Sequence, residues 1–157
     1  MNGASYQAIT VTIAPDRLRR VGPLVPGFWS HPILGESGRE VRGDFLIDTG
    51  AYGAMIDREV ADSLVLPQRG LKRVHGIHGS GRLPQYHAQL ILPTETADGL
   101  RSAFSMMLDC VGVPSLRQKN LEHEVEIIGI LGRQFLAATQ LVIDGLTGNV
   151  KLTIQGD

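Results

Sequence analysis

Only one cysteine, Cys110, occurs in the 157-residue sequence. Without a second cysteine no internal disulfide forms, which excludes a small secreted scaffold held by disulfides and favours a reducing compartment, so we expect a cytoplasmic location. Long apolar stretches are also missing, because no run approaches the roughly 18 residues that a membrane helix needs. The first charged side chain is Asp16, so the basic start of a signal peptide is absent. We therefore expect no membrane partner.

Charge of one sign is not in excess either. Lys and Arg number 15 against 16 Asp and Glu, which gives a formal net charge of −1. This balance disfavours a protein that binds nucleic acid through bulk positive charge, and we expect no nucleic-acid partner. The hydrophobic fraction of 43% is that of a globular chain, and the length suits a single domain over residues 1–157.

Glycine, by contrast, is abundant. The 19 glycines and 8 prolines are spread along the chain, which is typical of many short strands joined by turns. Strands are expected at 6–13, 45–47, 87–92, 104–111 and 125–131, and a terminal hairpin at 141–154. Short helices are expected at 57–64, capped by Asp57, and at 132–138. The segments 15–43 and 112–124 are expected to be loops, the first anchored on the core by Phe28 and Trp29.

The sharpest candidate for chemistry is Asp48-Thr49-Gly50. The apolar run 45–47 delivers a carboxylate into a tight turn, where glycine lets backbone amides approach its oxygens. The simpler interpretation is that Asp48 only caps a turn. A glycine-rich segment, 74–81, then lies between Leu71 and the alternating stretch 87–92, a pattern that predicts a hairpin with a mobile tip.

Histidines at 75, 78 and 87 raise the question of a metal. Zinc needs three or four ligands in tetrahedral reach, and the remaining candidates, His31, His123 and Cys110, lie in unrelated segments. We therefore expect no metal and no cofactor. The same glycines do not form a phosphate loop, because no Lys-Ser or Lys-Thr follows them.

These segments together resemble the retropepsin-like aspartic proteases. Residues 45–51 (FLIDTGA) are similar to the active-site strand and turn of that family, residues 130–136 (ILGRQFL) to its second motif, and residues 74–81 stand where its flap does. The resemblance covers a motif-bearing core at 45–136 and extends to the terminal hairpin 141–154, but it leaves 1–44 unexplained. It implies a mainly β fold: a closed β-barrel with a flap hairpin and one or two short helices.

Such a protease needs two carboxylates about 3 Å apart that share one proton. Within the chain, Asp144 (LVID) superficially repeats Asp48, but an Asp-Gly hairpin turn explains it better. A two-fold homodimer would instead supply Asp48 twice. The resemblance then implies an aspartic endopeptidase that hydrolyses peptide or protein substrates, with an acid limb in its pH profile. Thr49 would donate a hydrogen bond across the two-fold, and Gly50 would accept one from the substrate backbone.

Substrate-binding residues follow from the same resemblance. They are expected to be Ala51, Gly76, Ile77, His78, Gly79 and Ile130. The chain departs from the retroviral pattern at Tyr52 and Gly53, where an acidic residue usually stands, so Arg133 lacks its usual partner. Arg133 either finds another carboxylate, belongs to a different interface, or is solvated.

Two further expectations concern assembly and function. Segments 6–13 and 150–154 are candidates for an intersubunit sheet, as the termini are in retroviral relatives. The alternative function is a catalytically silent peptide-binding or scaffold module with the same fold. A hydrolase with another centre is disfavoured, because no Gly-x-Ser-x-Gly or His-Glu-x-x-His motif occurs.

Overall fold

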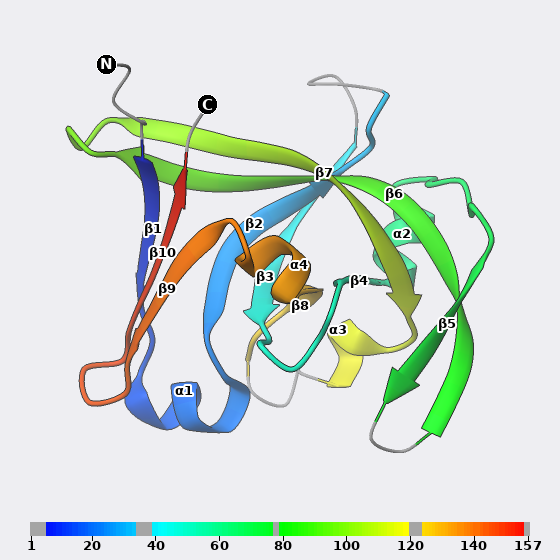
Figure 1. Cartoon of the computed structure of the whole chain (residues 1–157), viewed down its shortest axis with the longest axis horizontal. Coiled ribbons are helices and arrows are strands. Elements are labelled where there is room, and N and C mark those ends of the chain that lie inside the picture. Colours follow the sequence, from blue (N-terminus) through cyan, green and yellow to red (C-terminus); the bar gives the residue numbers. More distant parts are fainter. Residues whose placement is uncertain (1–5, 34–38, 77–78, 120–123, 156–157) are drawn as a thin grey trace.

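Six strands close a β-barrel in the computed structural model, which describes residues 6–33, 39–76, 79–119 and 124–155 (Figure 1). Around the barrel the order is β2 (Leu24–Ser30), β3 (Glu40–Ile47), β8 (Ile127–Leu131), β4 (Ala54–Asp57), β7 (Arg101–Val113) and β6 (Gly79–Thr96). Pairing of β6 with β2 completes the ring. The expected mainly β, closed-barrel fold is therefore confirmed.

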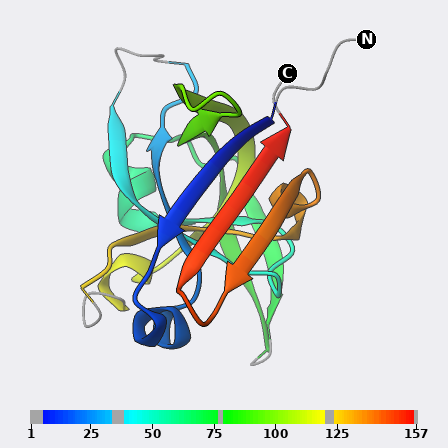
Figure 2. The same cartoon turned by 90° about the vertical axis from the view of Figure 1, so that its left-hand side faces the viewer.

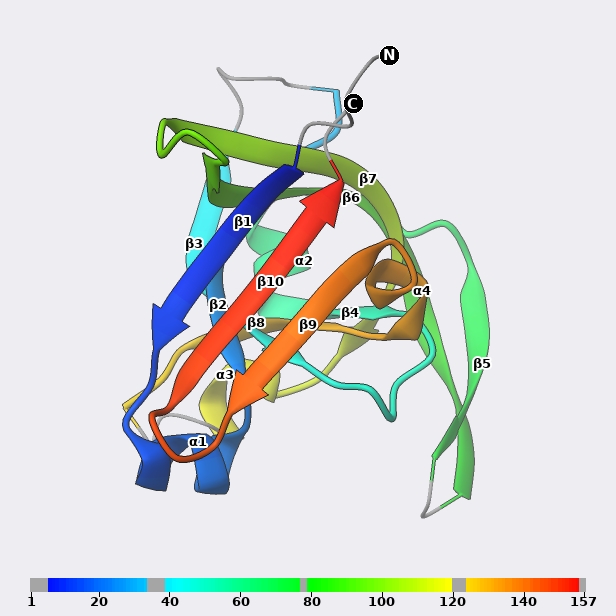
Figure 3. The same ribbon diagram turned by 60° about the vertical axis from the view of Figure 1, so that its left-hand side comes forward.

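The remaining strands leave the barrel in two directions (Figure 3). On one side, β1 (Tyr6–Thr12), β10 (Asn149–Gln155) and β9 (Thr139–Asp144) form an antiparallel arm that begins where β1 pairs with β6 (Figure 2). On the other side, β5 (Leu71–Gly76) pairs with the first part of β6 as a hairpin. The predicted first strand, the terminal hairpin and the glycine-rich hairpin are all present.

The arm also corrects one expectation about assembly. β10 is hydrogen-bonded to β1 on one edge and to β9 on the other. Segment 150–154 therefore has no free edge for a strand from a partner, and its predicted place in an intersubunit sheet is wrong. On one edge, residues 6–12 of the other segment, 6–13, pair along their whole length with β10 of the same chain. Among the described strands of the arm, the free edges are the outer edge of β9 and the part of β1 beyond Ala8 that does not pair with β6.

A tryptophan centres the barrel core. Trp29 is fully buried, its Nε1–H donates to the Ile128 carbonyl at 3.1 Å, and its ring meets Phe45 edge-on at a centroid distance of 5.1 Å. A Cβ at Gly129 would lie 2.8 Å from Trp29 Nε1, so a glycine is required there for the indole to fit. The expected anchoring role of Trp29 is confirmed, although on a strand.

Segment 15–43 is not the loop that its prolines and glycines suggested. It contains helix α1 (Pro15–Val21) and strand β2. Pro15 occupies the first turn of α1, where a missing N–H costs nothing, and Gly22 ends the helix at φ +105°. Pro26 lies in the part of β2 that pairs with β3 alone, since β6 joins only at Phe28. These residues mark boundaries and edges rather than the absence of structure.

The described residues contain four short helices, two of them where they were expected. Both α2 (Arg58–Ser63) and α4 (Arg133–Leu136) follow the prediction, while α1 and α3 (Leu116–Lys119) arise in the predicted loops. Asp57 caps α2 as expected, because its Oδ1 accepts from the Glu59 amide at 2.9 Å. Its Oδ2 also accepts from the Arg117 amide at 2.8 Å, which ties α3 to the same buried carboxylate. Within the described ranges, no helix has the length and apolarity needed to cross a membrane.

Candidate active site

Asp48 stands at the end of β3, in the turn that the sequence singled out. Its amide donates to the Leu131 carbonyl at 3.1 Å, so the neighbouring parallel strand β8 fixes where the turn begins. Its Oδ1 accepts from the Gly50 amide at 2.7 Å, and its carbonyl accepts from the Ala51 amide at 3.2 Å. Asp48 is half-buried, whereas Thr49 and Gly50 are exposed. The carboxylate is thus held in place with one side of its turn open to solvent.

The junction between β8 and α4 binds the segment that follows Asp48. Arg133 donates from one guanidinium nitrogen to the carbonyls of Thr49 and Gly50, at 2.9 Å each. The Arg133 amide donates to the Ala51 carbonyl at 2.9 Å, and the Gln134 amide to the Tyr52 carbonyl at 2.8 Å. Arg133 therefore pairs with backbone carbonyls and, within the part of the chain that the structure describes, with no carboxylate. Apart from the presence of Arg133, nothing in the sequence indicated that the second motif would bind these carbonyl groups.

Gly132 permits this close approach. A Cβ at this position would lie 2.6 Å from the carbonyl oxygens of both Ala51 and Gly53, a separation that real Cβ atoms do not reach. Any larger residue would push the junction away from the loop. The two predicted motifs, at 45–51 and 130–136, are therefore in direct contact, and the second supports the first.

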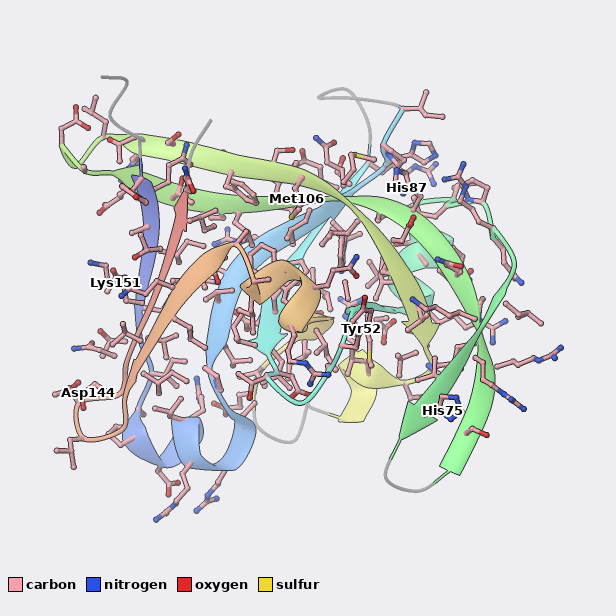
Figure 4. All side chains as sticks on the ribbon, in the orientation of Figure 1. Tyr52, His75, His87, Met106, Asp144 and Lys151 are labelled. Atoms are coloured by element: carbon pink, nitrogen blue, oxygen red, sulfur yellow. The ribbon has the colours of Figure 1, made fainter. Side chains whose placement is uncertain are left out.

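A cavity of about 350 Å³ opens beside the turn. Its walls are the loop 50–55, β5 of the hairpin, Gln85 of β6, residues 109–111 of β7, and Arg133. Tyr52 lies on the barrel side and His75 on the hairpin side (Figure 4). The volume falls within the range of small-molecule and peptide pockets. The cavity places a binding space directly next to the Asp-Thr-Gly turn.

The residues expected to bind substrate are distributed unevenly around this cavity. Ala51 lines it, while Ile130 is half-buried and packs against the core. Gly76 and Gly79 face each other where the hairpin ends. Ile77 and His78 lie outside the described residues. Tyr52, Lys72 and Asp109 also line the cavity, although the sequence did not mark them as binding residues; they come from three separate segments and become neighbours only through the fold.

Asp144 does not serve as a second acid within the chain. It is the last residue of β9, where the turn to β10 begins, far from Tyr52 in the view of Figure 4. Its Oδ1 accepts from the amides of Leu146 at 2.9 Å and Thr147 at 3.2 Å. Hydrogen bonds from the Thr147 side chain and from both amides lower the pKa of Asp144. Asp144 is a turn residue, as the hairpin interpretation predicted.

Other reactive groups are engaged elsewhere. Cys110 is buried, its Sγ–H donates to the Tyr86 carbonyl at 3.7 Å, and burial raises the pKa of its thiol to about 12, so it cannot act as a thiolate nucleophile. His87 Nδ1 lies 2.8 Å from Asp109 Oδ1 across the β6–β7 ladder. In the part of the chain that the structure describes, no three His, Cys, Asp or Glu side chains group as metal ligands do.

Comparison with known proteins agrees with this geometry. A family model described as aspartyl protease matches residues 35–135, a range that includes the Asp48 turn, the β5–β6 hairpin and the start of α4. No curated protein matched the chain. The match covers more than half of the sequence, and on this ground the chain belongs to the aspartyl protease family.

Proposed function

We propose that the chain is a homodimeric aspartic endopeptidase in which a water molecule is activated between two Asp48 carboxylates, one from each copy. The observation that carries this proposal is the Asp48 turn itself. Its carboxylate is fixed by the Gly50 amide at 2.7 Å, while Thr49 and Gly50 are exposed beside a cavity. Membership of the aspartyl protease family supports the same chemistry.

The need for a second copy follows from the other carboxylates of the chain. Asp57 is bound to the amides of α2 and α3, Asp109 to His87, and Asp144 to its own turn. Among the described residues, no other carboxylate is hydrogen-bonded to Asp48. A two-fold axis at the exposed turn would bring the partner's Asp48 opposite, and Thr49 would donate its hydroxyl across the interface.

The reaction then needs only the two carboxyl groups and water. One Asp48 is ionised and accepts a proton from water as the water oxygen attacks the scissile carbonyl carbon. The partner's Asp48 is protonated and donates to the carbonyl oxygen. Collapse of the resulting diol returns that proton to the dyad and delivers the other proton to the leaving amine. The paired carboxyls share one proton because two like charges this close cannot both ionise freely.

The β5–β6 hairpin would act as the flap. It forms one wall of the cavity through Lys72, Val74 and Gln85, and its outer residues are exposed. An extended peptide between the hairpin and the loop 50–55 would pair its backbone as an added strand and present side chains alternately to the two walls. Gly50, exposed at the turn, would accept from the substrate backbone.

A mixed peptide library tests the proposal. The parent chain should cleave it and be inhibited by a pepstatin-type compound, whereas Asp48→Asn should lose cleavage while keeping its melting temperature, since the amide oxygen can still accept from the Gly50 amide. Asp144→Asn is the matched control and should cleave as the parent does. Cleavage that survives Asp48→Asn would refute the proposal. Peptide binding by the parent without any cleavage would favour the silent peptide-binding module.

A further inference from the structure

The cavity wall opposite the Asp48 turn carries ionisable side chains of one charge sign. Residues 63–94 contain Arg69, Lys72, Arg73 and Arg82 but none of the chain's 16 Asp and Glu residues. The whole chain has a formal net charge of −1, so the four positive charges of this segment are balanced by acidic residues in the rest of the chain. Such local segregation creates a field over one face without changing the overall balance.

The lining of the cavity has the same bias. Lys72, Arg73 and Arg133 line it, and Asp109 is the one acid among the described lining residues. Asp109 is already bound to His87 Nδ1 at 2.8 Å. Arg133 is held by carbonyl groups and not by a carboxylate, so its charge is not neutralised. The cavity therefore presents net positive charge to whatever enters it.

Lys72 is placed to meet a ligand in the cavity. Its Nζ lies 6.0 Å from the centroid of the Tyr52 ring, so the side chain extends from the hairpin toward the loop that follows the catalytic turn. Tyr52 is itself an exposed part of the cavity lining. Within the described residues Lys72 has no carboxylate partner. Its ammonium group thus marks the cavity with an unpaired cation held over an aromatic face.

Arg73 adds a second unpaired cation with an unfavourable neighbour. It borders the cavity, and Arg82 stands directly opposite it in the β5–β6 register. Like charges directly opposite each other on paired strands destabilise the sheet. Neither guanidinium forms an ion pair within the described part of the chain. Because successive side chains of a strand point to opposite faces, Arg73 and Arg82 lie on the face of the hairpin away from Lys72, and their charges add to its positive field.

We propose, on the basis of the protease function proposed above, that this site takes acidic peptides: Asp or Glu side chains near the scissile bond bind Lys72 of the hairpin. Because this cation is exposed to water, each such pair adds about two- to fivefold in affinity, and the gain falls as salt screens the charges. The field of the hairpin also speeds association of an acidic chain with the cavity. Lys72 is then a residue that determines specificity.

The test uses three short peptides with one shared apolar centre and with Glu, Gln or Lys flanks, each bearing a neutral fluorophore. Their binding to Asp48→Asn is measured by fluorescence anisotropy at low and high sodium chloride, so that the result does not depend on turnover. The Glu peptide should bind about two- to fivefold more tightly than the Gln peptide for each acidic residue engaged, and the Lys peptide more weakly. High salt should reduce these differences.

Variants of Lys72 then locate the preference. In the Asp48→Asn background, Lys72→Gln should shrink the Glu-to-Gln ratio and Lys72→Glu should reverse it. Lys151→Gln, on β10 at the far side of the molecule, removes an equal charge and should leave the ratio unchanged (Figure 4). Equal binding of the three peptides, or a ratio that Lys72→Gln does not alter, would overturn the inference. Cleavage of the same peptides by the parent chain separately decides the proposed function.

Discussion

Asp48 depends on a small set of backbone contacts that hold its turn in one shape. The Gly50 amide fixes the carboxylate, and the β8–α4 junction fixes the residues beyond it through Arg133 and two backbone amides. The Gly50 amide belongs to the turn itself, whereas Arg133 and the two junction amides come from a segment far along the sequence. Catalytic geometry at the residue scale should therefore be sensitive to changes that never touch Asp48.

Gly132→Ala is predicted to damage the site through the backbone. Its added Cβ would lie 2.6 Å from two carbonyl oxygens, so the junction must move. The hydrogen bonds from the Arg133 and Gln134 amides to the Ala51 and Tyr52 carbonyls must then lengthen. We expect a loss of about 2 kcal/mol or more in the free energy of unfolding, together with a large fall in kcat. The matched control is Gly53→Ala, whose Cβ would meet only Gln134 Oε1 at 3.6 Å. Equal effects of the two substitutions, in urea denaturation and in kcat, would contradict this role of Gly132.

Asp44 provides a pH dependence of stability that is separate from catalysis. Burial raises the pKa of its carboxyl group, while the nearby Arg17 and Arg42 act in the opposite direction. A folded-state pKa above the unfolded value means that the ionised form is disfavoured in the native protein. Stability linked to this group is therefore complete below its ordinary pKa of 3.8 and is lost as pH rises through the raised value.

The substitution that tests this effect is Asp44→Asn. The variant should gain stability over the parent between about pH 3 and pH 7, since it never has to ionise. Thermal unfolding across this range measures the difference, and Asp62→Asn, at an exposed position on α2, is the control. A difference between Asp44→Asn and the parent that stays constant with pH would contradict the effect of burial.

At the scale of elements, the sequence predicted those helices, strands and hairpins that are specified by residues close together in the chain. The apolar run before Asp48, the Asp57 cap, the glycine-rich hairpin and the terminal hairpin each have a short-range signal, and all four are present. Segment 15–43 was wrongly predicted to be a loop, because Pro15, Gly22 and Pro26 interrupt a helix or strand only when they lie in its interior. Here they stand at a helix start, a helix end and a singly paired stretch of strand. Their meaning depends on neighbours from β3 and β6.

The candidate site likewise has one part that the sequence predicted and another that it did not. The Asp48 turn was predictable because one strand and one turn specify it. The contacts of Lys72 with Tyr52, and of Arg133 with the Thr49 carbonyl, join residues about 20 and 84 positions apart. Backbone acceptors and aromatic faces are available throughout a chain, so no spacing in the sequence singles out such pairs. Which of these residues come into contact is determined by the closed barrel.

Gly148 tests how the terminal arm is attached. It has φ +76°, its carbonyl accepts from the Ile13 amide at 2.8 Å, and an added Cβ would lie 1.8 Å from the Ile13 carbonyl oxygen. Gly148→Ala should therefore lower the free energy of unfolding by about 2 kcal/mol or more, from left-handed strain and lost packing of β1 on β10. Gly145→Ala, in the same turn, adds a Cβ into open space and should change it by less than about 0.5 kcal/mol.

Urea denaturation of the two turn variants measures this difference. A Gly148→Ala protein as stable as Gly145→Ala would show that the arm is not held at this point. The result matters for the proposed function because the arm continues directly from α4, whose first residues bind the loop that follows Asp48.

At the scale of the whole molecule, the proposed mechanism requires one chain to supply half of a catalytic centre. The barrel brings Asp48 to an exposed turn beside the cavity, and the other carboxylates described above have partners of their own. Two-fold symmetry is the simplest way to complete the centre, since identical copies then contribute identical groups. Because β10 is paired on both edges, contacts between copies must use other surfaces than its backbone.

Subunit mixing tests this central claim most directly. Parent and Asp48→Asn chains are unfolded, combined in varying ratios at constant total concentration, refolded together and assayed for peptide cleavage. If each active centre needs Asp48 from two copies, activity should follow the square of the parent fraction, so that an equal mixture retains about a quarter of the activity. Activity that falls in direct proportion to the parent fraction, with about half remaining in an equal mixture, would show that a single chain is sufficient and would contradict the shared dyad.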